Sequence, residues 1–437
     1  MDGGNTKQEQ NPAFQYTAQT VSPIVNDESK LTIGENSLSV TALFDVAEIA
    51  YAEINTLSFA DYVVTVKTDG GDYNFSRMGN WAQPFYDALC DAYNKAVLRS
   101  FFIKDTPILT AKGDYRYSEK NISGSGSAPV HVYENNVTAL PPDLSARRVP
   151  LCFVTAMDKG DYELTLTLNT GESYTYTKLG YDTVPFADAV EKQIRALREK
   201  SLLAIKELDP TLSAAQASQL AKIMPEGAAA PFGQIVNIAP TFAAAVEEKI
   251  NQTRAAEYYA VFKELCDPMS IYVGFRKNDT RESSGSTPDL NNITPDIDVN
   301  IDSLLGGFAG DIQQSEDDSE PSQDAYLLWL IVPSPDGQYA VVEFAQVDSA
   351  TFIYETGGDF SRFAQQLNRA LEAINFKREV IRLSDEDLRK PENVDYFMAA
   401  KRTASLQFVR NNFTERLIHS SPESWKRKLT EIWNALR

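Results

Sequence analysis

The chain has 437 residues, of which 43% are hydrophobic and 11% aromatic, and it carries a formal net charge of −20 with a pI near 4.6. This composition predicts folded domains, and the length predicts two to four of them. Phosphate groups repel so negative a chain, so we expect no non-specific binding to nucleic acid and disfavour anionic membranes, which leaves protein partners.

The N-terminal residues lack a basic region followed by an apolar core, so no signal peptide is expected. The longest apolar run, "AYLLWLIVP" (Ala325–Pro333), is too short to span a bilayer and is typical of a buried strand. Three widely spaced cysteines, Cys90, Cys152 and Cys266, give neither a disulfide framework nor a metal-ligand spacing. We therefore expect a cytoplasmic bacterial protein.

Residues 1–30 are expected to form a disordered tail, after which the chain repeats itself. "DYVVTVKTDGGDYNFSRMG" (Asp61–Gly79) is followed about a hundred residues later by "DYELTLTLNTGESYTYTKLG" (Asp161–Gly180). Apolar residues alternate in each stretch, beginning with Tyr62 in the first and Tyr162 in the second, and glycine interrupts both. Each stretch therefore predicts two antiparallel strands joined by a tight turn, with the alternating residues on one face.

A helix is predicted behind each hairpin, beginning at Pro84 in the first copy and at Pro185 in the second. Apolar residues recur there at helical spacing, which indicates a buried stripe. The stripes comprise Phe85, Leu89, Tyr93 and Val97 in the first copy, and Phe186, Val190, Ile194 and Leu197 in the second. The repeated unit covers residues 31–104 and 128–206. Residues 105–127, which end in the Gly/Ser run Ser123–Ser127, are interpreted as a flexible linker.

This pattern resembles the pleckstrin-homology (PH) superfold, in particular its bacterial PH-like and GRAM-like forms. The shared features are an early strand, a strand of the "YAEI" type, a strand–turn–strand that ends in glycine, and a capping helix. The resemblance implies an α+β protein of repeated antiparallel β-barrel or sandwich units, each closed by a C-terminal helix. Fold alone implies little about function.

The second half of the chain is less regular. Residues 207–262 predict a helical connector, and residues 263–375 a degraded third PH-like copy with an acidic, disordered insertion at 276–324. Residues 376–437 predict a helical tail with thirteen Lys or Arg and nine Asp or Glu. Its basic and aromatic residues Arg410, Phe413 and Arg416 suggest docking, either on an acidic partner or internally on the acidic repeats, and internal docking is favoured.

No motif predicts a catalytic residue, a metal or a cofactor. "DIDVNID" (Asp296–Asp302) places oxygen ligands at alternate positions, but Ile301 and Gly307 stand where a calcium loop needs glycine and glutamate. The glycine clusters Ser123–Ser127 and Leu304–Gly310 lack the order of a phosphate-binding loop. His131 and His419 accompany no recognisable nucleophile motif.

The sequence therefore predicts a noncatalytic scaffold or adaptor that binds protein partners. Its candidate surfaces are exposed strand edges and the groove between sheet and capping helix. The candidate binding residues in the repeats are Tyr62, Trp81 and Tyr162. A peripheral membrane protein that binds lipid headgroups is the alternative, with Arg147 and Arg148 as the candidate basic pocket. An enzyme with a site outside known motifs is the third hypothesis.

Overall fold

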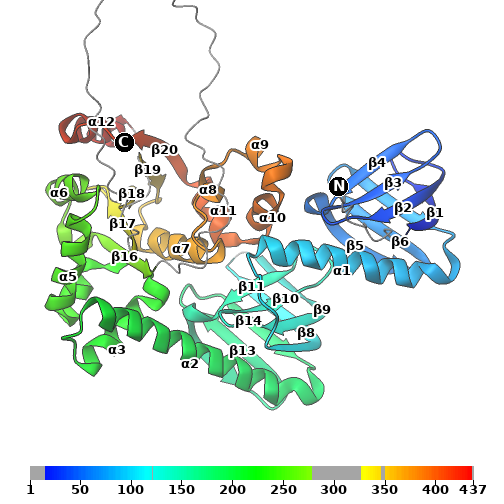
Figure 1. The fold of residues 1–437 in the computed structure, drawn as a ribbon, viewed down its shortest axis with the longest axis horizontal. Helices are drawn as coiled ribbons and strands as arrows, with labels where there is room; N and C mark the ends of the chain where they lie inside the picture. Colours follow the sequence, from blue (N-terminus) through cyan, green and yellow to red (C-terminus); the bar gives the residue numbers. More distant parts are fainter. Residues whose placement is uncertain (1–14, 121, 278–325, 346–349, 436–437) are drawn as a thin grey trace, which may run out of the picture.

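A computed structural model describes residues 15–120, 122–277, 326–345 and 350–435. The protein is α+β: within these ranges, two seven-stranded sheets and one six-stranded sheet, all antiparallel, pack with helices (Figure 1). The candidate calcium loop, the Leu304–Gly310 cluster and nearly all of the acidic insertion lie outside the described residues.

The first unit is a seven-stranded sheet closed by a helix. It contains β1 (Gln15–Val21), β2 (Glu28–Ile33), β3 (Ser37–Thr41), β4 (Val46–Ala50), β5 (Ile54–Ala60), β6 (Val63–Thr68), β7 (Gly71–Ser76) and helix α1 (Ala82–Ser100). The strand order is β4-β3-β2-β1-β7-β6-β5. The expectation that residues 1–30 form a disordered tail was therefore wrong from Gln15 onward. The alternating residues of β1 that turn inward include Ala18 and Thr20, which are small or polar and give a weak strand signal.

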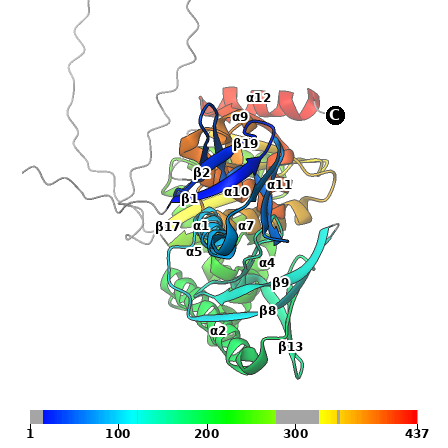
Figure 2. The same ribbon diagram turned by 90° about the vertical axis from the view of Figure 1, so that its right-hand side faces the viewer.

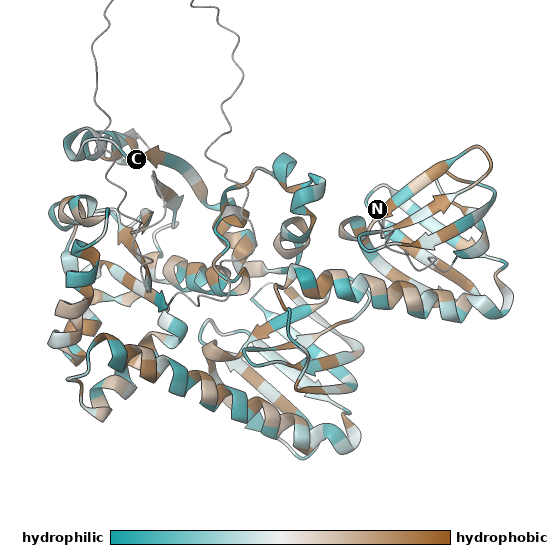
Figure 3. Ribbon diagram, in the orientation of Figure 1, coloured by the Kyte–Doolittle hydropathy of each residue, from teal (hydrophilic) through white to brown (hydrophobic). Residues whose placement is uncertain are grey.

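The second unit repeats this arrangement. It contains β8 (Leu109–Glu119), β9 (Ile122–Val132), β10 (Asn136–Ala139), β11 (Arg147–Pro150), β12 (Val154–Lys159), β13 (Glu163–Leu168), β14 (Ser173–Thr177) and helix α2 (Thr183–Leu208). Its order, β11-β10-β9-β8-β14-β13-β12, is that of the first unit shifted by seven strands. Polar and apolar residues alternate along the strands of both sheets (Figure 3).

Backbone details confirm the duplication. Arg77 and Lys178 have left-handed φ values of 60° and 55°, and Gly79 and Gly180 follow with 56° and 61°. Each glycine opens a single 3₁₀ turn that leads into the capping helix. Both helices begin two residues before the proline at which we placed their start, and the two predicted apolar stripes are buried.

The predicted linker 105–127 is instead a long hairpin. β8 and β9 pair over eleven residues, from Leu109↔Val132 to Glu119↔Ile122. Gly124 and Gly126 lie in β9 opposite Tyr117 and Tyr115, and a Cβ on Gly124 would meet the Tyr117 ring at 2.6 Å. The glycines therefore make room for tyrosine rings across the strand pair, which a Gly/Ser-rich sequence does not distinguish from flexibility.

The third sheet contains β15 (Ala230–Pro231), β16 (Tyr272–Lys277), β17 (Tyr326–Pro333), β18 (Tyr339–Phe344), β19 (Ala350–Glu355) and β20 (Phe413–Ile418). Its described strands lie side by side in sequence order, unlike those of the first two sheets. Its edge strands β15 and β20 come from the connector and from the tail. The boundaries 263–375 therefore do not enclose this sheet, and its strand order does not repeat that of the first two units.

Helices cover both faces of the third sheet. Leu328, Leu330 and Val332 of β17 face a core with the connector helices α3 (Ala214–Ile223), α4 (Phe232–Ile238), α5 (Pro240–Asn251) and α6 (Ala256–Leu265). Trp329 and Ile331 face the opposite core with α7 (Phe360–Ala373). Burial on both faces explains the continuous apolar run of β17.

The C-terminal segment joins the units together. Its elements are α8 (Glu379–Arg382), α9 (Asp385–Leu388), α10 (Val394–Arg402), α11 (Ala404–Asn411), β20 and α12 (Pro422–Ala435). α10 packs on α1, α11 on α7, and α12 on α6. Figure 2, which looks along α1, shows the first unit in front of these C-terminal elements. The tail docks internally, as favoured, but the expectation that it is wholly helical was wrong at β20.

Candidate functional site

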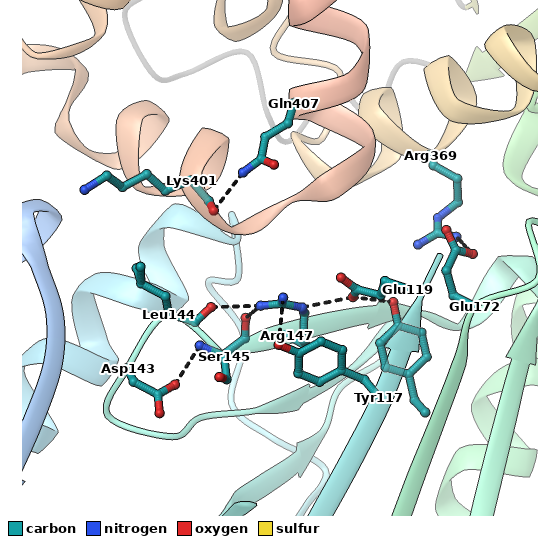
Figure 4. Close-up of polar contacts among 12 residues, drawn as sticks. Tyr117, Glu119, Asp143, Leu144, Ser145, Arg147, Glu172, Arg369, Lys401 and Gln407 are labelled. Atoms are coloured by element: carbon teal, nitrogen blue, oxygen red, sulfur yellow. Dashed lines mark hydrogen bonds and ion pairs between the residues drawn. The ribbon is translucent and has the colours of Figure 1, made fainter. Parts of the chain in front are cut away.

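Arg147 and Arg148, the candidate lipid pocket, are consecutive residues of β11, so their side chains leave the strand in opposite directions. Arg147 is buried, and its Nε donates to Glu119 Oε1 at 2.9 Å (Figure 4). Its other nitrogens donate to Tyr117 Oη and to the carbonyl oxygens of Leu144 and Ala146, at 2.9–3.0 Å. All three nitrogens of the guanidinium are therefore used inside the protein.

Arg148 points to α7, where its two terminal nitrogens donate to the two carboxylate oxygens of Glu372 at 2.6 and 2.7 Å. One α-helical turn earlier, Arg369 Nη1 donates to Glu172 Oε2 at 3.0 Å and to Thr170 Oγ1 at 2.7 Å, both in the β13–β14 turn. These two arginine–glutamate pairs run in opposite directions between the second unit and α7.

A fourth guanidinium completes the group. Arg402, at the end of α10, donates to Tyr93 Oη of α1 at 2.6 Å and to the carbonyl oxygen of Met398. We call this group the arginine junction; its members are Arg147, Arg148, Arg369, Arg402, Glu119, Glu172 and Glu372. Elements of both N-terminal units, α7 and α10 therefore meet at one buried polar site.

The junction encloses a cavity of about 30 Å³, room for about two water molecules. Arg148 Nε, Arg402 Nε and Glu119 Oε2 belong to residues lining this cavity, and none of these atoms has a hydrogen-bond partner among the described residues. Burial, together with the adjacent Glu119 carboxylate, raises the pKa of Tyr174 well above its usual value, so this phenol donates to Glu119 at 2.8 Å. The cavity is too small for a lipid headgroup, which would have to displace Glu119 or Glu372.

The tyrosines Tyr62 and Tyr162 are exposed at equivalent turns, 72% and 79% respectively. The alternation grouped them with the other apolar residues on one face of each hairpin, but each lies in the turn before its strand, and only the later alternating residues are buried. Trp81, also exposed, follows β7 and contacts Tyr16.

Pairing brings these aromatic residues to one end of each unit. The register Val64↔Phe75 places the turn that holds Tyr62 beside the end of β7, and Trp81 follows five residues later. Glu163↔Thr177 does the same for Tyr162 in the second unit, where the fully exposed Tyr181 follows. We call these the aromatic corners. Sequence reasoning missed Tyr181 because it aligns with Asn80 rather than with Trp81.

The tail residues are divided between structure and surface. Arg410 donates to the Val380 carbonyl oxygen and to Asp385, and the Phe413 ring lies 5.6 Å from that of Tyr354. Arg416 lies in β20 opposite Phe352 and is exposed. The structure therefore does not bring these three residues together as one docking surface.

The histidines and cysteines lie apart from the arginine junction, except for Cys152. His419 Nε2 lies 3.2 Å from Glu343 Oε2 and from Thr351 Oγ1, and its ring stacks on Tyr258. His131 contacts Thr110, and burial lowers its pKa. Burial, then the nearby Glu372 and Glu226, raises the pKa of Cys152 well above its ordinary value, which disfavours the thiolate.

Two further searches of the described residues concern metals and membranes. In those residues, no three His, Cys, Asp or Glu side chains are grouped so that they could hold a metal ion. No helix within the described ranges combines the length and the apolar character needed to cross a membrane.

Comparison with known proteins gives no family. No family model and no curated protein matches the chain. Among solved structures, it is similar to the one titled "Structure of the Spt16D Pob3N heterodimer", at 10% identity over 37% of this chain and 86% of that one. The TM-score is 0.16, so this likeness carries no argument about fold or function.

Proposed function

We propose that this protein is a noncatalytic scaffold whose first two units are PH-like modules that bind protein partners. The strand order of both units supports the PH-like assignment: a seven-stranded antiparallel sheet followed directly by a capping helix, built twice with the same order.

The observation that carries the binding role is the pair of aromatic corners. Tyr62 and Tyr162 stay exposed at equivalent turns, although the hairpins around them differ in sequence. Tyrosine and tryptophan combine a large apolar area with few rotatable bonds, and they are enriched at binding hot spots. Two such corners on one chain suit a protein that engages partners at two equivalent sites.

The test is affinity purification of the tagged protein from its native host, followed by binding measurements with the purified partner. The double variant Tyr62→Ser/Tyr162→Ser is compared with Leu203→Ser, which removes an exposed apolar side chain of α2 away from the turns. We expect the double variant to weaken binding at least about tenfold, the scale of a hot-spot loss, and Leu203→Ser to bind normally.

Two outcomes would overturn the proposal. If a partner binds equally well to both variants, the aromatic corners are not the binding surface. If the protein is recovered alone and floats with anionic liposomes, the lipid-binding alternative replaces the scaffold, and its site lies outside Arg147 and Arg148.

A further inference from the structure

The loop between the third and fourth strands differs in environment between the two units. Thr41-Ala42-Leu43 leaves β3 in the first unit, and Thr138-Ala139-Leu140 leaves β10 in the second. The strands that flank the two loops share a hydrogen bond at their other end. Tyr51 N donates to Asn36 O in the first unit, and Leu151 N donates to Asn135 O in the second. The two loops are therefore equivalent, and the registers Ser37↔Ala50 and Asn136↔Pro150 align Leu140 with Thr41, so Leu43 lies two residues further into its loop. Leu140 is 2% exposed and Leu43 is 79% exposed.

In the second unit this loop forms the contact with the first unit. Leu140 and Ala146 lie in the hydrophobic core of the first unit. Leu57 N donates to Pro142 O at 2.8 Å, and Leu144 N donates to Asn55 O at 3.2 Å. The loop thus adds a short antiparallel segment to β5, the edge strand of the first sheet, with Thr56 opposite Asp143. Tyr93 Oη of α1 donates to Asp143 O as well.

The corresponding edge of the second unit is β12, and it has the same shape as β5. Both strands shift register at the equivalent place, between Ile54 and Thr56 in β5 and between Val154 and Ala156 in β12. Among the described strands, β12 pairs only with β13. Thr155 and Ala156, which correspond to Asn55 and Thr56, are exposed. An exposed edge with free backbone groups is a template for another strand.

The equivalent loop of the first unit is bare. Leu43, Phe44 and Val46 are all largely exposed. The β3–β4 turn lies at one end of β3, and the β2–β3 turn lies at the other. Of these two turns, only the β2–β3 turn forms a side-chain hydrogen bond with α1 among the described residues: its Glu35 and Asn36 accept from Arg99. Adjacent large apolar side chains on a hairpin turn mark an interaction surface. Besides its internal contact, the chain therefore carries a second, shorter apolar loop at the equivalent end of a sheet and a second edge strand of the same shape, both exposed.

We propose that the β3–β4 turn of one molecule docks on the β12 edge of a second copy of this chain, and so repeats between molecules the contact that joins the two units within one. Leu43 and Phe44 supply the apolar burial that Leu140 and Ala146 supply internally. The contact is head to tail, so it leaves a free turn at one end and a free edge at the other, and further copies can add.

Two features set the expected strength of this association between copies. The free turn has four residues between its strands where the docked loop has seven, so it offers fewer backbone groups. The net charge of −20 also makes two copies repel each other. We therefore expect weak association that strengthens with salt, because salt screens this repulsion.

Sedimentation tests the proposal on the full chain. The weight-average mass of the wild type should rise above 48.6 kDa with concentration, up to about 100 μM, the range of a small interface, and rise further in about 0.5 M NaCl. Leu43→Asp/Phe44→Asp replaces the apolar side chains of the β3–β4 turn with charged ones. Met157→Pro removes the backbone N–H of β12 that corresponds to the N–H that Leu57 donates in β5. Each variant should stay at 48.6 kDa, while the control Leu203→Asp should associate like the wild type.

Mixing the two variants gives the decisive result, because each retains the half that the other lacks. The mixture should form a 1:1 dimer and nothing larger, which also shows that both variants are folded. A wild type that stays monomeric at every concentration and salt would overturn the proposal. So would association that survives both variants, or a mixture that stays monomeric while the wild type associates.

Discussion

Arg148 on β11 and Glu372 on α7 form a two-pronged ion pair between residues 224 positions apart in the chain. Their side chains are 7% and 11% exposed, and the pair ties the second unit to the layer of helices beside the third sheet. Both charges are largely removed from water, and the two parallel hydrogen bonds between them offset part of the desolvation cost of each.

Breaking this pair on one side should destabilise the protein strongly. Arg148→Met leaves the Glu372 carboxylate buried without its partner, at a cost of about 3–5 kcal/mol, while Arg148→Met/Glu372→Leu should recover most of that loss. Urea unfolding followed by tryptophan fluorescence measures both, with Arg195→Met, from an exposed pair with Glu191, as a control within about 0.5 kcal/mol. A double variant no more stable than the single one would show that the pair is not coupled.

The β8–β9 hairpin can be tested at Gly124. Gly124→Ala places a methyl group into the Tyr117 ring and should lower the free energy of unfolding by about 1–3 kcal/mol. Ser125→Ala, at the next and exposed position of the same strand, should be neutral. Equal stability of the two variants would instead favour the flexible linker that we predicted from the sequence.

Trp425 tests the internal docking of the tail. It is fully buried in α12, with its ring 4.9 Å from Tyr258 and 5.2 Å from Phe262 of α6. Trp425→Ala should cost about 3–5 kcal/mol, which thermal unfolding detects. Arg416→Ala in the neighbouring β20 should leave the melting temperature unchanged, because that side chain is exposed. A neutral Trp425→Ala would mean that α12 does not pack on α6.

The cysteines predict a pH dependence. Burial raises the pKa of Cys90 and of Cys266 to about 11, so only about 0.1% of each thiol is ionised at pH 8. Reaction with a disulfide reagent should be slow at pH 8 and accelerate about tenfold per pH unit toward pH 10, whereas denaturant should expose three fast thiols. Fast labelling of the native protein at pH 8 would contradict the burial of the Cys90 and Cys266 thiols.

The same shifts also affect stability. In the unfolded chain these thiols ionise near pH 9, so the folded state binds protons more tightly between about pH 9 and 11. Their contribution to the free energy of unfolding is therefore complete below pH 9 and is lost as the pH rises toward 11. Cys90→Ser and Cys266→Ser should each flatten the fall in the urea midpoint over this range.

The sequence predicted the parts of the fold that depend on regular apolar spacing. The two hairpins after Asp61 and Asp161, both capping helices and β17 lie where the pattern placed them, and their marked apolar residues are buried except Tyr62 and Tyr162. It missed β1, β8, the first half of β9, and β20, where glycines, small residues or a single inward apolar residue obscure the alternation. In β20, "FTERLI", Leu417 alone is buried, so no alternation marks the strand.

The arginine junction could not be predicted from the sequence, for a different reason. Arg147 and Arg148 were noticed as the basic residues of the repeats and interpreted as a pocket for anions. Their carboxylate partners, Glu119 and Glu372, lie 28 and 224 residues away, and only the packing of α7 on β11 brings the second pair together. Charge alone does not tell whether a cation serves a ligand or a neighbouring part of the same chain.

The place of β20 in the third sheet has a consequence for protein synthesis. The first two sheets are complete once residue 177 has left the ribosome, and their capping helices once residue 208 has. β19 then waits for Phe413–Ile418, more than fifty residues later, to cover its edge. A nascent chain in this interval exposes an apolar strand, "ATFIYE", that can pair with other chains. We expect the nascent chain to aggregate most readily when the ribosome stalls between residues 355 and 413.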